Sequence, residues 1–281
     1  MFPCKISDML ELTVLPFIAF FIGMVAAMAG IGGGVFMVPI LTLLFGFEPA
    51  HASGTSIAVI VFTSLSSVFR YSKQRRIDYL LGFLLASTTI PGAFIGSYLT
   101  KLIEKRTLGL IFAFFLMFVA FRSLMKGKTV ERKEVLGRVK GRLERRIVDN
   151  YNETFVYSVN TWLIPILGLA GGFFSGLLGI GGGAVLVPAM NLALGVPIHI
   201  TVATSMFIMV FTSTSGALTH LWLQHVHLDY VALLAAGVIF GAQVGAHYAR
   251  KVSAGNLKRL FGVILLIASI RMILKYSMVI P

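Results

Sequence analysis

The glycine-rich phrase AGIGGGVFMVP, residues 29–39, decides the fold of this chain because it returns as LGIGGGAVLVP at residues 178–188. The two phrases begin 149 residues apart, and each lies inside a strongly apolar stretch. Glycine-interrupted apolar segments at matching positions of two halves are typical of secondary transporters, where they mark the binding site. The phrase therefore raises the question whether the whole chain is a duplicated membrane protein.

The composition answers the first part of that question. Of the 281 residues, 57% are hydrophobic and only 12% are charged, whereas an ordinary soluble domain carries about 25% charged residues. Apolar windows of ~20 residues, the length that crosses a bilayer, recur along the chain. These features predict an all-α polytopic membrane protein, with the lipid bilayer as its surroundings.

The apolar windows predict about eight transmembrane helices, if each glycine-interrupted first stretch is one broken span. The segments that follow the glycines are short, at 11 residues each, which is about 16 Å of helix. They could therefore be half-helices that re-enter the membrane, so the sequence leaves open whether the two halves are parallel or inverted. The expected segments are 12–29 with 35–45, 50–68, 79–99, 108–124, 161–178 with 184–194, 200–223, 230–248 and 257–273.

A shift of 149 residues aligns much more than the glycines, which predicts a tandem duplication. We expect a first transmembrane repeat at residues 1–125, a basic connector at 126–158 and a second repeat at 159–281. One pair, Asp78–Tyr79 with Asp229–Tyr230, aligns only after a small local slip. The other matched segments are Thr55–Ser56 with Thr204–Ser205, VFTSLSS from Val61 with VFTSTSG from Val210, and Gly92–Ala93 with Gly241–Ala242.

The basic charge is concentrated in two segments. The connector holds nine Lys/Arg and five Asp/Glu residues, and residues 70–76 read RYSKQRR. Basic loops stay on the cytoplasmic side of a membrane, so we expect both segments there, together with both chain ends. No nucleic-acid-binding motif accompanies this charge, so a nucleic-acid partner is not expected.

The glycine phrases do not fit nucleotide-binding motifs. A Walker A loop needs GxxxxGK[ST], and a dinucleotide fingerprint needs a third glycine where this chain has Val35 and Ala184. Close helix packing is one role for such glycines. The other is an unwound turn whose amides face a cavity, with the following helix presenting its N-terminus to an anion.

The acidic residues favour an anion as the transported species. All eleven Asp and Glu residues lie near the ends of expected spans or in loops, whereas carriers of hard metal cations need charged oxygen ligands within the membrane. We therefore expect no metal site and no cofactor, and an anion held by neutral donors. No nucleophile–base motif or HExxH pattern is present, so an enzyme is not expected.

The doubled GIGGGxxxVP phrase, placed after the first span of each half, resembles the sulfite exporter TauE/SafE family of membrane permeases. The resemblance covers nearly the whole chain. It implies a multi-pass protein of the cytoplasmic membrane that moves sulfite, a sulfonate or another small organosulfur anion. Two alternatives stay open, a passive anion channel and a carrier for a small anion without sulfur. The sequence contains no ATP-binding motif, so any energy coupling is expected to use a proton or another ion. The oligomeric state, the direction of transport and the anion itself are not readable.

Duplicated glycines and hydroxyl residues are the candidate anion ligands. The Thr-Ser pairs are expected to open the helices after the glycine segments, and Asn191 stands where the first half has Thr42. His220 has no histidine counterpart in the first half and is expected to be dispensable, although histidine titrates near neutral pH. The substrate-binding candidates are Gly32, Gly33, Gly34, Thr55, Ser56, Gly181, Gly182, Gly183, Asn191, Thr204 and Ser205.

Overall fold

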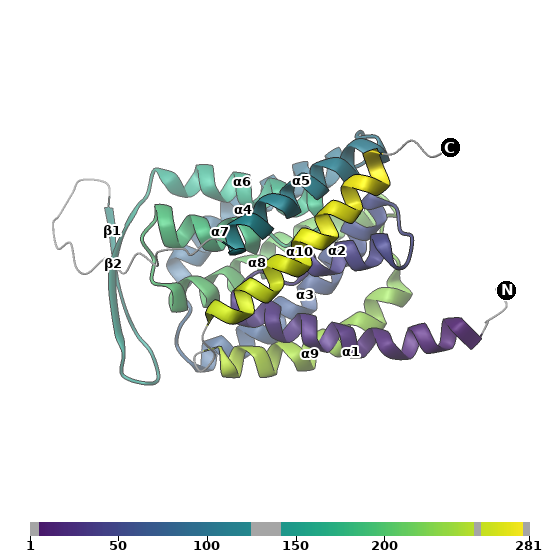
Figure 1. Ribbon diagram of the computed structural model, residues 1–281. Coiled ribbons are helices and arrows are strands. Elements are labelled where there is room, and N and C mark those ends of the chain that lie inside the picture. The colour runs from purple at the N-terminus through teal and green to yellow at the C-terminus, as the bar shows by residue number, and fades with distance from the viewer. Residues whose placement is uncertain (1–5, 125–141, 250–253, 278–281) are drawn as a thin grey trace.

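The computed structural model describes residues 6–124, 142–249 and 254–277 (Figure 1). Two series of helices flank an antiparallel hairpin, β1 (Arg142–Val148) and β2 (Thr154–Asn160). The first series is α1 (Ile6–Ala29), α2 (Gly34–Leu43), α3 (Pro49–Lys73), α4 (Tyr79–Leu99) and α5 (Lys105–Leu124). The second is α6 (Leu163–Leu178), α7 (Gly183–Pro188) continued by the π-helical turn η1 (Ala189–Ala193), α8 (Ile198–Trp222), α9 (Leu228–Tyr248) and α10 (Ala254–Ser277).

The helices have the length and composition of a polytopic membrane protein. Five of them in the described part of the chain, α3, α4, α5, α8 and α9, are long and apolar enough to cross a membrane, and four shorter apolar segments accompany them. This confirms the helical membrane architecture in its coarse form. The number of eight spans and the boundaries of the two repeats stay predictions. One expected boundary, 125/126, lies outside the described residues, and the other, 158/159, falls within β2.

The second series of helices runs opposite to the first. The bounds of α3 and α8 differ by 149 residues at both ends, as do those of α4 and α9. Yet α3 and α8 pack antiparallel, since Gly54 lies against His220 while Gly216 lies against Ile57. The structure thus selects the inverted arrangement from the two that the sequence left open.

The uniform offset corrects one detail of the sequence alignment. The residue that caps the N-terminus of α4 is Asp78, and the residue in the same position before α9 is His227. The alignment of Asp78 with Asp229 through a local slip is therefore wrong. The two acidic residues attracted each other in the alignment by type, whereas the helix starts show that the chain keeps a constant spacing.

The short helices explain the inversion. With ten residues, α2 spans about 15 Å, which is too short to cross a bilayer, so α1 and α2 together form a re-entrant pair that returns to its starting end. Three crossings, α3, α4 and α5, then follow. Each half therefore crosses an odd number of times, which places its two ends on opposite ends of the helix bundle.

The two ends of the bundle carry different segments. The hairpin lies at the end where α3 stops, since the Asn150 side chain donates to the carbonyl of Lys73. At the other end Arg106, in the first turn of α5, donates to the carbonyl of Tyr276 near the end of α10. Figure 1 shows α1 beginning and α10 ending at this second end. The hairpin and residues 70–76 share an end, as expected, but the prediction that the chain termini join them is wrong.

The two halves are interlocked. Helix α1 packs along α9, α4 along α6, and α5 along α10, so each of these pairs joins the first half to the second. Glycines allow the closest approaches: a Cβ atom at Gly241 would lie 1.9 Å from the carbonyl oxygen of Phe20, and one at Gly172 would lie 2.1 Å from that of Thr89. Small residues at helix contacts are what packing in a membrane requires. Neither half would bury its helix faces without the other.

Candidate functional site

Each glycine phrase forms a sharp turn that reverses the chain. Gly32 and Gly33 have φ angles of 77° and 94°, and Gly181 and Gly182 have φ angles of 77° and 80°. A residue with a side chain is strained in this left-handed region, whereas glycine is not. Gly33 then caps α2 and Gly182 caps α7. The first two glycines of each GGG run are therefore required by the turn itself.

The third glycine of each run brings the two turns together. A Cβ atom at Gly34 would lie 2.3 Å from the carbonyl oxygen of Gly179, and one at Gly183 would lie 2.4 Å from that of Gly30. The phrases, far apart in the sequence, thus touch each other across the pseudo-twofold relation of the halves. A packing role for these two glycines is established by the same contacts, and a ligand-binding role is not excluded by them.

The turns present amides without partners. Within the described part of the chain, no hydrogen-bond partner is found for the amide N–H groups of Gly34 and Val35 in α2, or of Gly183 and Ala184 in α7. The first-turn amides of a helix carry partial positive charge and favour an anion. The meeting point of the turns therefore has neutral, donor-rich backbone from both halves.

Two apolar side chains that the sequence analysis did not single out fill the space beside the turns. Ile60 and Met209 are 149 residues apart and are buried at the middle of α3 and α8. A Cβ atom at Gly32 would lie 2.7 Å from Met209 Sδ, and one at Gly181 would lie 2.9 Å from Ile60 Cγ2. The offset of 149 was the signal that could have paired them. In this conformation an ion reaches the turns only if these side chains move.

The serines of the Thr-Ser pairs hold the opposite turn. Ser56 Oγ donates to the carbonyl of Gly179 at 2.8 Å, and Ser205 Oγ donates to that of Gly30 at 2.9 Å. Both serines are fully buried. Each half therefore braces the glycine turn of the other half, and the hydroxyl hydrogens are engaged with these carbonyls in the conformation described.

The threonines hold the starts of the following helices. Thr55 Oγ1 accepts from the backbone N–H of His227 at 3.1 Å, and Thr204 Oγ1 accepts from that of Asp78 at 3.0 Å. The expectation that the Thr-Ser pairs open their helices is wrong. Helix α3 begins at Pro49 and α8 at Ile198, so the pairs lie inside the helices because the helices extend a further turn toward the loops.

Asn191 lies apart from the turns. It belongs to η1, and its side-chain amide donates to the carbonyl of Val196 at 2.9 Å. Among the described residues it has no hydrogen bond to either glycine turn. Its counterpart Thr42 is buried, and the hydroxyl of Thr42 has no partner there. A direct contact of Asn191 with an anion stays a prediction without support from this geometry.

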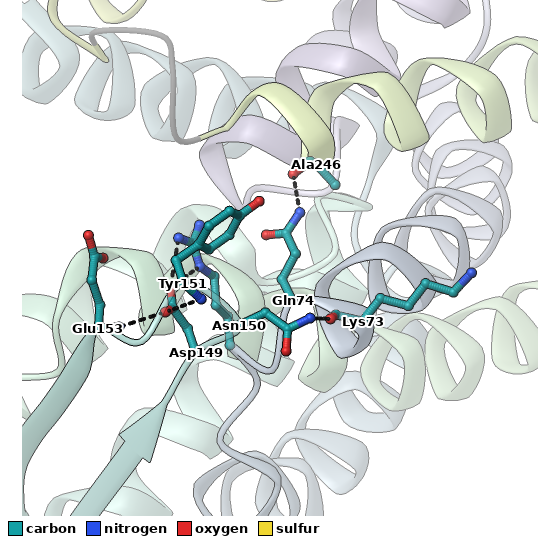
Figure 2. Close-up of polar contacts among 8 residues, drawn as sticks. Lys73, Gln74, Asp149, Asn150, Tyr151, Glu153 and Ala246 are labelled. Atoms are coloured by element: carbon teal, nitrogen blue, oxygen red, sulfur yellow. Dashed lines mark hydrogen bonds and ion pairs between the residues drawn. The ribbon is translucent and has the colours of Figure 1, made fainter.

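The hairpin end is closed by buried ion pairs that the sequence analysis did not find. Arg76 donates to Asp149 Oδ2 through Nε and Nη2, at 3.1 and 2.9 Å, and both side chains are almost fully buried. Figure 2 shows the hairpin turn around Asp149 and Asn150 lying against Lys73 and Gln74, with Gln74 bonded to Ala246 of α9. The hairpin therefore ties α3 to α9 and the connector.

A second ion pair joins the same hairpin to α4. Arg145 donates to both carboxylate oxygens of Asp78, at 2.9 and 2.7 Å, and the Tyr157 hydroxyl donates to Oδ2 at 2.6 Å. Burial alone would raise the pKa of Asp78, but these donors and the Leu81 amide outweigh burial and lower it. The same competition, with Arg76 as the main donor, lowers the pKa of Asp149. Both carboxylates are thus held ionised.

Four histidines gather at the opposite end, and we call His51, His220, His225 and His227 the histidine cluster. The rings of His51 lie 5.2 and 5.1 Å from those of His225 and His227, and His220 Nδ1 lies 3.4 Å from His225 Nδ1. Only His225 and His227 form the interfacial loop that the sequence predicted; His51 and His220 come from α3 and α8. Within the described residues, no group of three or more His, Cys, Asp or Glu side chains is placed to hold a metal ion.

Comparison with known proteins places this arrangement in a family. The sequence model of the sulfite exporter TauE/SafE family matches residues 15–272. The chain belongs to the TauE/SafE family. It is 33% identical over 269 residues to the probable membrane transporter protein YunE of Bacillus subtilis, covering 93% of this chain and 96% of that protein.

More distant relatives of the TauE/SafE family are also matched. The probable membrane transporter protein MJ0441 of Methanocaldococcus jannaschii is 25% identical over 95% of this chain and 97% of its own length. The sulfite exporter TauE/SafE family protein 3 of Arabidopsis thaliana is 23% identical over 84% of this chain and 71% of its own length. No solved structure matches the chain. The chain is therefore a membrane transporter of this family.

Proposed function

We propose that this transporter is a secondary carrier in the cytoplasmic membrane for a small anion, with sulfite, a sulfonate or another organosulfur anion as the substrate class. One observation carries the proposal: two glycine turns from inverted halves meet and present unpartnered amides from both sides. Inverted halves that meet at a central site are the architecture of alternating access. The name of the family supports the sulfur-containing class.

Neutral donors suit such a cycle. Backbone amides hold an anion without binding it to a buried fixed cation, so release remains easy. Gly32, Gly33 and Gly34, with Gly181, Gly182 and Gly183, would supply the donors. Thr55, Ser56, Thr204 and Ser205 would keep the two turns in register in the conformation described. Movement of Ile60 and Met209 would then open access from one end or the other.

The test is substitution at one turn in each half. Gly33→Val and Gly182→Val should each weaken binding of the same anion by about 10–150-fold, because loss of one good donor to a charged group costs about 1.5–3 kcal/mol. Binding is measured by thermal shift of the purified protein with sulfite, thiosulfate, isethionate, a carboxylate or Mg²⁺, since a ligand stabilises the folded state that binds it.

Matched controls separate the site from backbone strain. Gly46 and Gly195 also have φ angles of 70°, but a Cβ atom there would meet nothing within 4 Å. Gly46→Ala and Gly195→Ala should leave anion binding unchanged. If Gly33→Val and Gly182→Val remain folded and bind as the unsubstituted protein does, the turns are packing devices only. Accumulation of the anion against a gradient in vesicles distinguishes a carrier from a passive channel.

A further inference from the structure

The histidine cluster forms a continuous row from the protein interior to its surface. His220 is fully buried in the last turn of α8, and His227 is exposed before α9. His225 and His51 lie between them and are half-buried. Ring centroids of successive members are 5.1 to 5.6 Å apart. A proton arriving at the surface therefore has titratable rings along the whole distance to His220.

The inner end of this row is next to the second glycine turn. His220 Nε2 lies 3.0 Å from the carbonyl oxygen of Gly176, in the last turn of α6 before that turn begins. A Cβ atom at Gly54 would lie 3.1 Å from His220 Nδ1, and the neighbouring Ser53 lies against Gly179. A charge on the cluster is thus one helical turn from the backbone that would bind an anion.

The cluster has capacity for a proton. Nε2 of His220 donates to the Gly176 carbonyl, so a neutral His220 keeps Nδ1 as an acceptor toward His225 Nδ1. Nδ1 of His51 is buried and has no hydrogen-bond partner among the described residues. Neutral imidazole carries one acceptor nitrogen. Two of the four rings therefore offer a buried nitrogen to an added proton.

The surrounding charges leave the cluster without a fixed ionic partner. The charged and titratable groups that face it are Glu48 before α3, Lys101 after α4, Lys105 of α5, Asp229 of α9 and Tyr276 of α10. Glu48 is exposed and is paired with Lys105 at 3.5 Å. Because rings about 5 Å apart repel one another when both are charged, the cluster titrates as a unit and takes up its first proton much more readily than its second.

We propose that the histidine cluster binds the coupling proton of this transporter, taking up one proton together with the anion and releasing both on the other side. The inference rests on the proposed function and deepens it. A proton on the cluster supplies the positive charge that the neutral amides lack, so proton and anion each favour the binding of the other. It also replaces the expectation that His220 is dispensable, because the other three rings around it are visible only in the fold.

The first arm of the test needs no substrate. Thermal unfolding of the purified protein is measured from pH 7.5 to 5.5 for the unsubstituted chain, for His220→Gln and for His225→Gln. The unsubstituted chain should lose stability as the cluster becomes charged, and both variants should show a much flatter pH dependence. His247→Gln is the matched control, since His247 is exposed, lies at the hairpin end and contacts Arg70. It should behave as the unsubstituted chain does.

The second arm measures coupling. Vesicles containing the protein and an internal pH-sensitive dye receive an inward gradient of isethionate, a sulfonate that carries no titrating group between pH 5 and 8. The unsubstituted chain and His247→Gln should acidify the interior as the anion enters. His220→Gln and His225→Gln should lose most of this acidification, at least tenfold per anion moved.

Each outcome decides a different claim. A pH response or a proton flux per anion that persists in His220→Gln and His225→Gln overturns the cluster as the proton site. Anion uptake without acidification in the unsubstituted chain overturns the coupling. If none of sulfite, thiosulfate or isethionate binds or enters while the histidine-dependent pH response remains, the proposed function fails, and the cluster stands only as a proton-binding site.

Discussion

The hairpin end and the histidine end of the bundle are built on the same backbone and differ in chemistry. Tyr71 donates to the carbonyl of Ala27, and its counterpart His220 contacts the carbonyl of Gly176, which is the equivalent position 149 residues later. Beyond these contacts the ends diverge. Arg76 and Asp78 at one end correspond to His225 and His227 at the other.

The divergence separates permanent charge from titratable charge. At the hairpin end the connector supplies Asp149, Arg145 and Tyr157, which pair with Arg76 and Asp78 in a buried network. At the histidine end no strand covers the equivalent loop in the described part of the chain, and neutral rings stack on one another. Two mouths of an inverted scaffold can thus be closed by different forces, one independent of pH near neutrality and one sensitive to it.

The largest effect is expected from breaking the hairpin end. Arg76→Ala leaves Asp149 buried without its cation, and breaking a buried pair in this way costs about 3–5 kcal/mol. We expect the hairpin to detach, which is measured as faster proteolysis within residues 142–160 and a lower unfolding temperature.

The matched change at the other end should cost little. Lys105→Ala removes the exposed pair with Glu48, and surface pairs contribute about 0–1 kcal/mol. Equal losses of stability in Arg76→Ala and Lys105→Ala would mean that the hairpin network does not close its end more firmly than a surface ion pair.

A smaller effect is expected at the threonines that both ends share. Thr204→Val and Thr55→Val each remove the acceptor for a helix-capping amide, of Asp78 and His227 respectively. An unpaired buried donor costs about 1–3 kcal/mol. Thr204→Val should cost more, because Asp78 is fully buried and His227 is exposed.

The control for the threonines comes from the chain itself. The hydroxyl of Thr42 is buried without a partner in the described residues, so Thr42→Val should leave stability unchanged or raise it slightly. Chemical denaturation in detergent gives the free energy of unfolding for all three variants. A loss at Thr42 as large as that at Thr204 would show that the change of shape, not the hydrogen bond, is responsible.

The smallest effect is a difference in the pH at which the two ends loosen. The lowered pKa values of Asp78 and Asp149 give stabilisation that is present above the ordinary aspartate pKa of about 3.9 and is lost as pH falls through their lower folded values. The pKa of His225 is lowered by burial and by His51. Protonation there destabilises the folded state as pH falls below about 6.5.

Between about pH 6.5 and 4, therefore, only the histidine end should loosen. Hydrogen exchange measured by mass spectrometry at pH 7.5 and 5.5, corrected for the intrinsic exchange rate, would report it. Peptides covering residues 220–230 should lose protection at pH 5.5, while those covering 74–82 should keep it. Simultaneous loss at both ends would remove the distinction between them.

The sequence by itself determined the membrane class, the two glycine turns and the spacing of 149 residues, because composition and local glycine conformation act over short stretches. It also identified Thr55, Ser56, Thr204 and Ser205 as a matched set. It did not determine what these hydroxyls bond, because their partners lie more than 120 residues away. The resemblance of the doubled phrase carried the family and the substrate class further than composition could.

Only the tertiary structure decided the orientation of the halves, the ends of the bundle and the chemistry at each mouth. Whether α2 crosses or returns depends on its packing against α3, so the parity of crossings could not be read from hydropathy. His51 joins His225 because α3 and α8 run antiparallel, and Asp149 reaches Arg76 because the connector folds back as a hairpin. Such pairings follow from where whole helices lie, a property that no local stretch of residues contains.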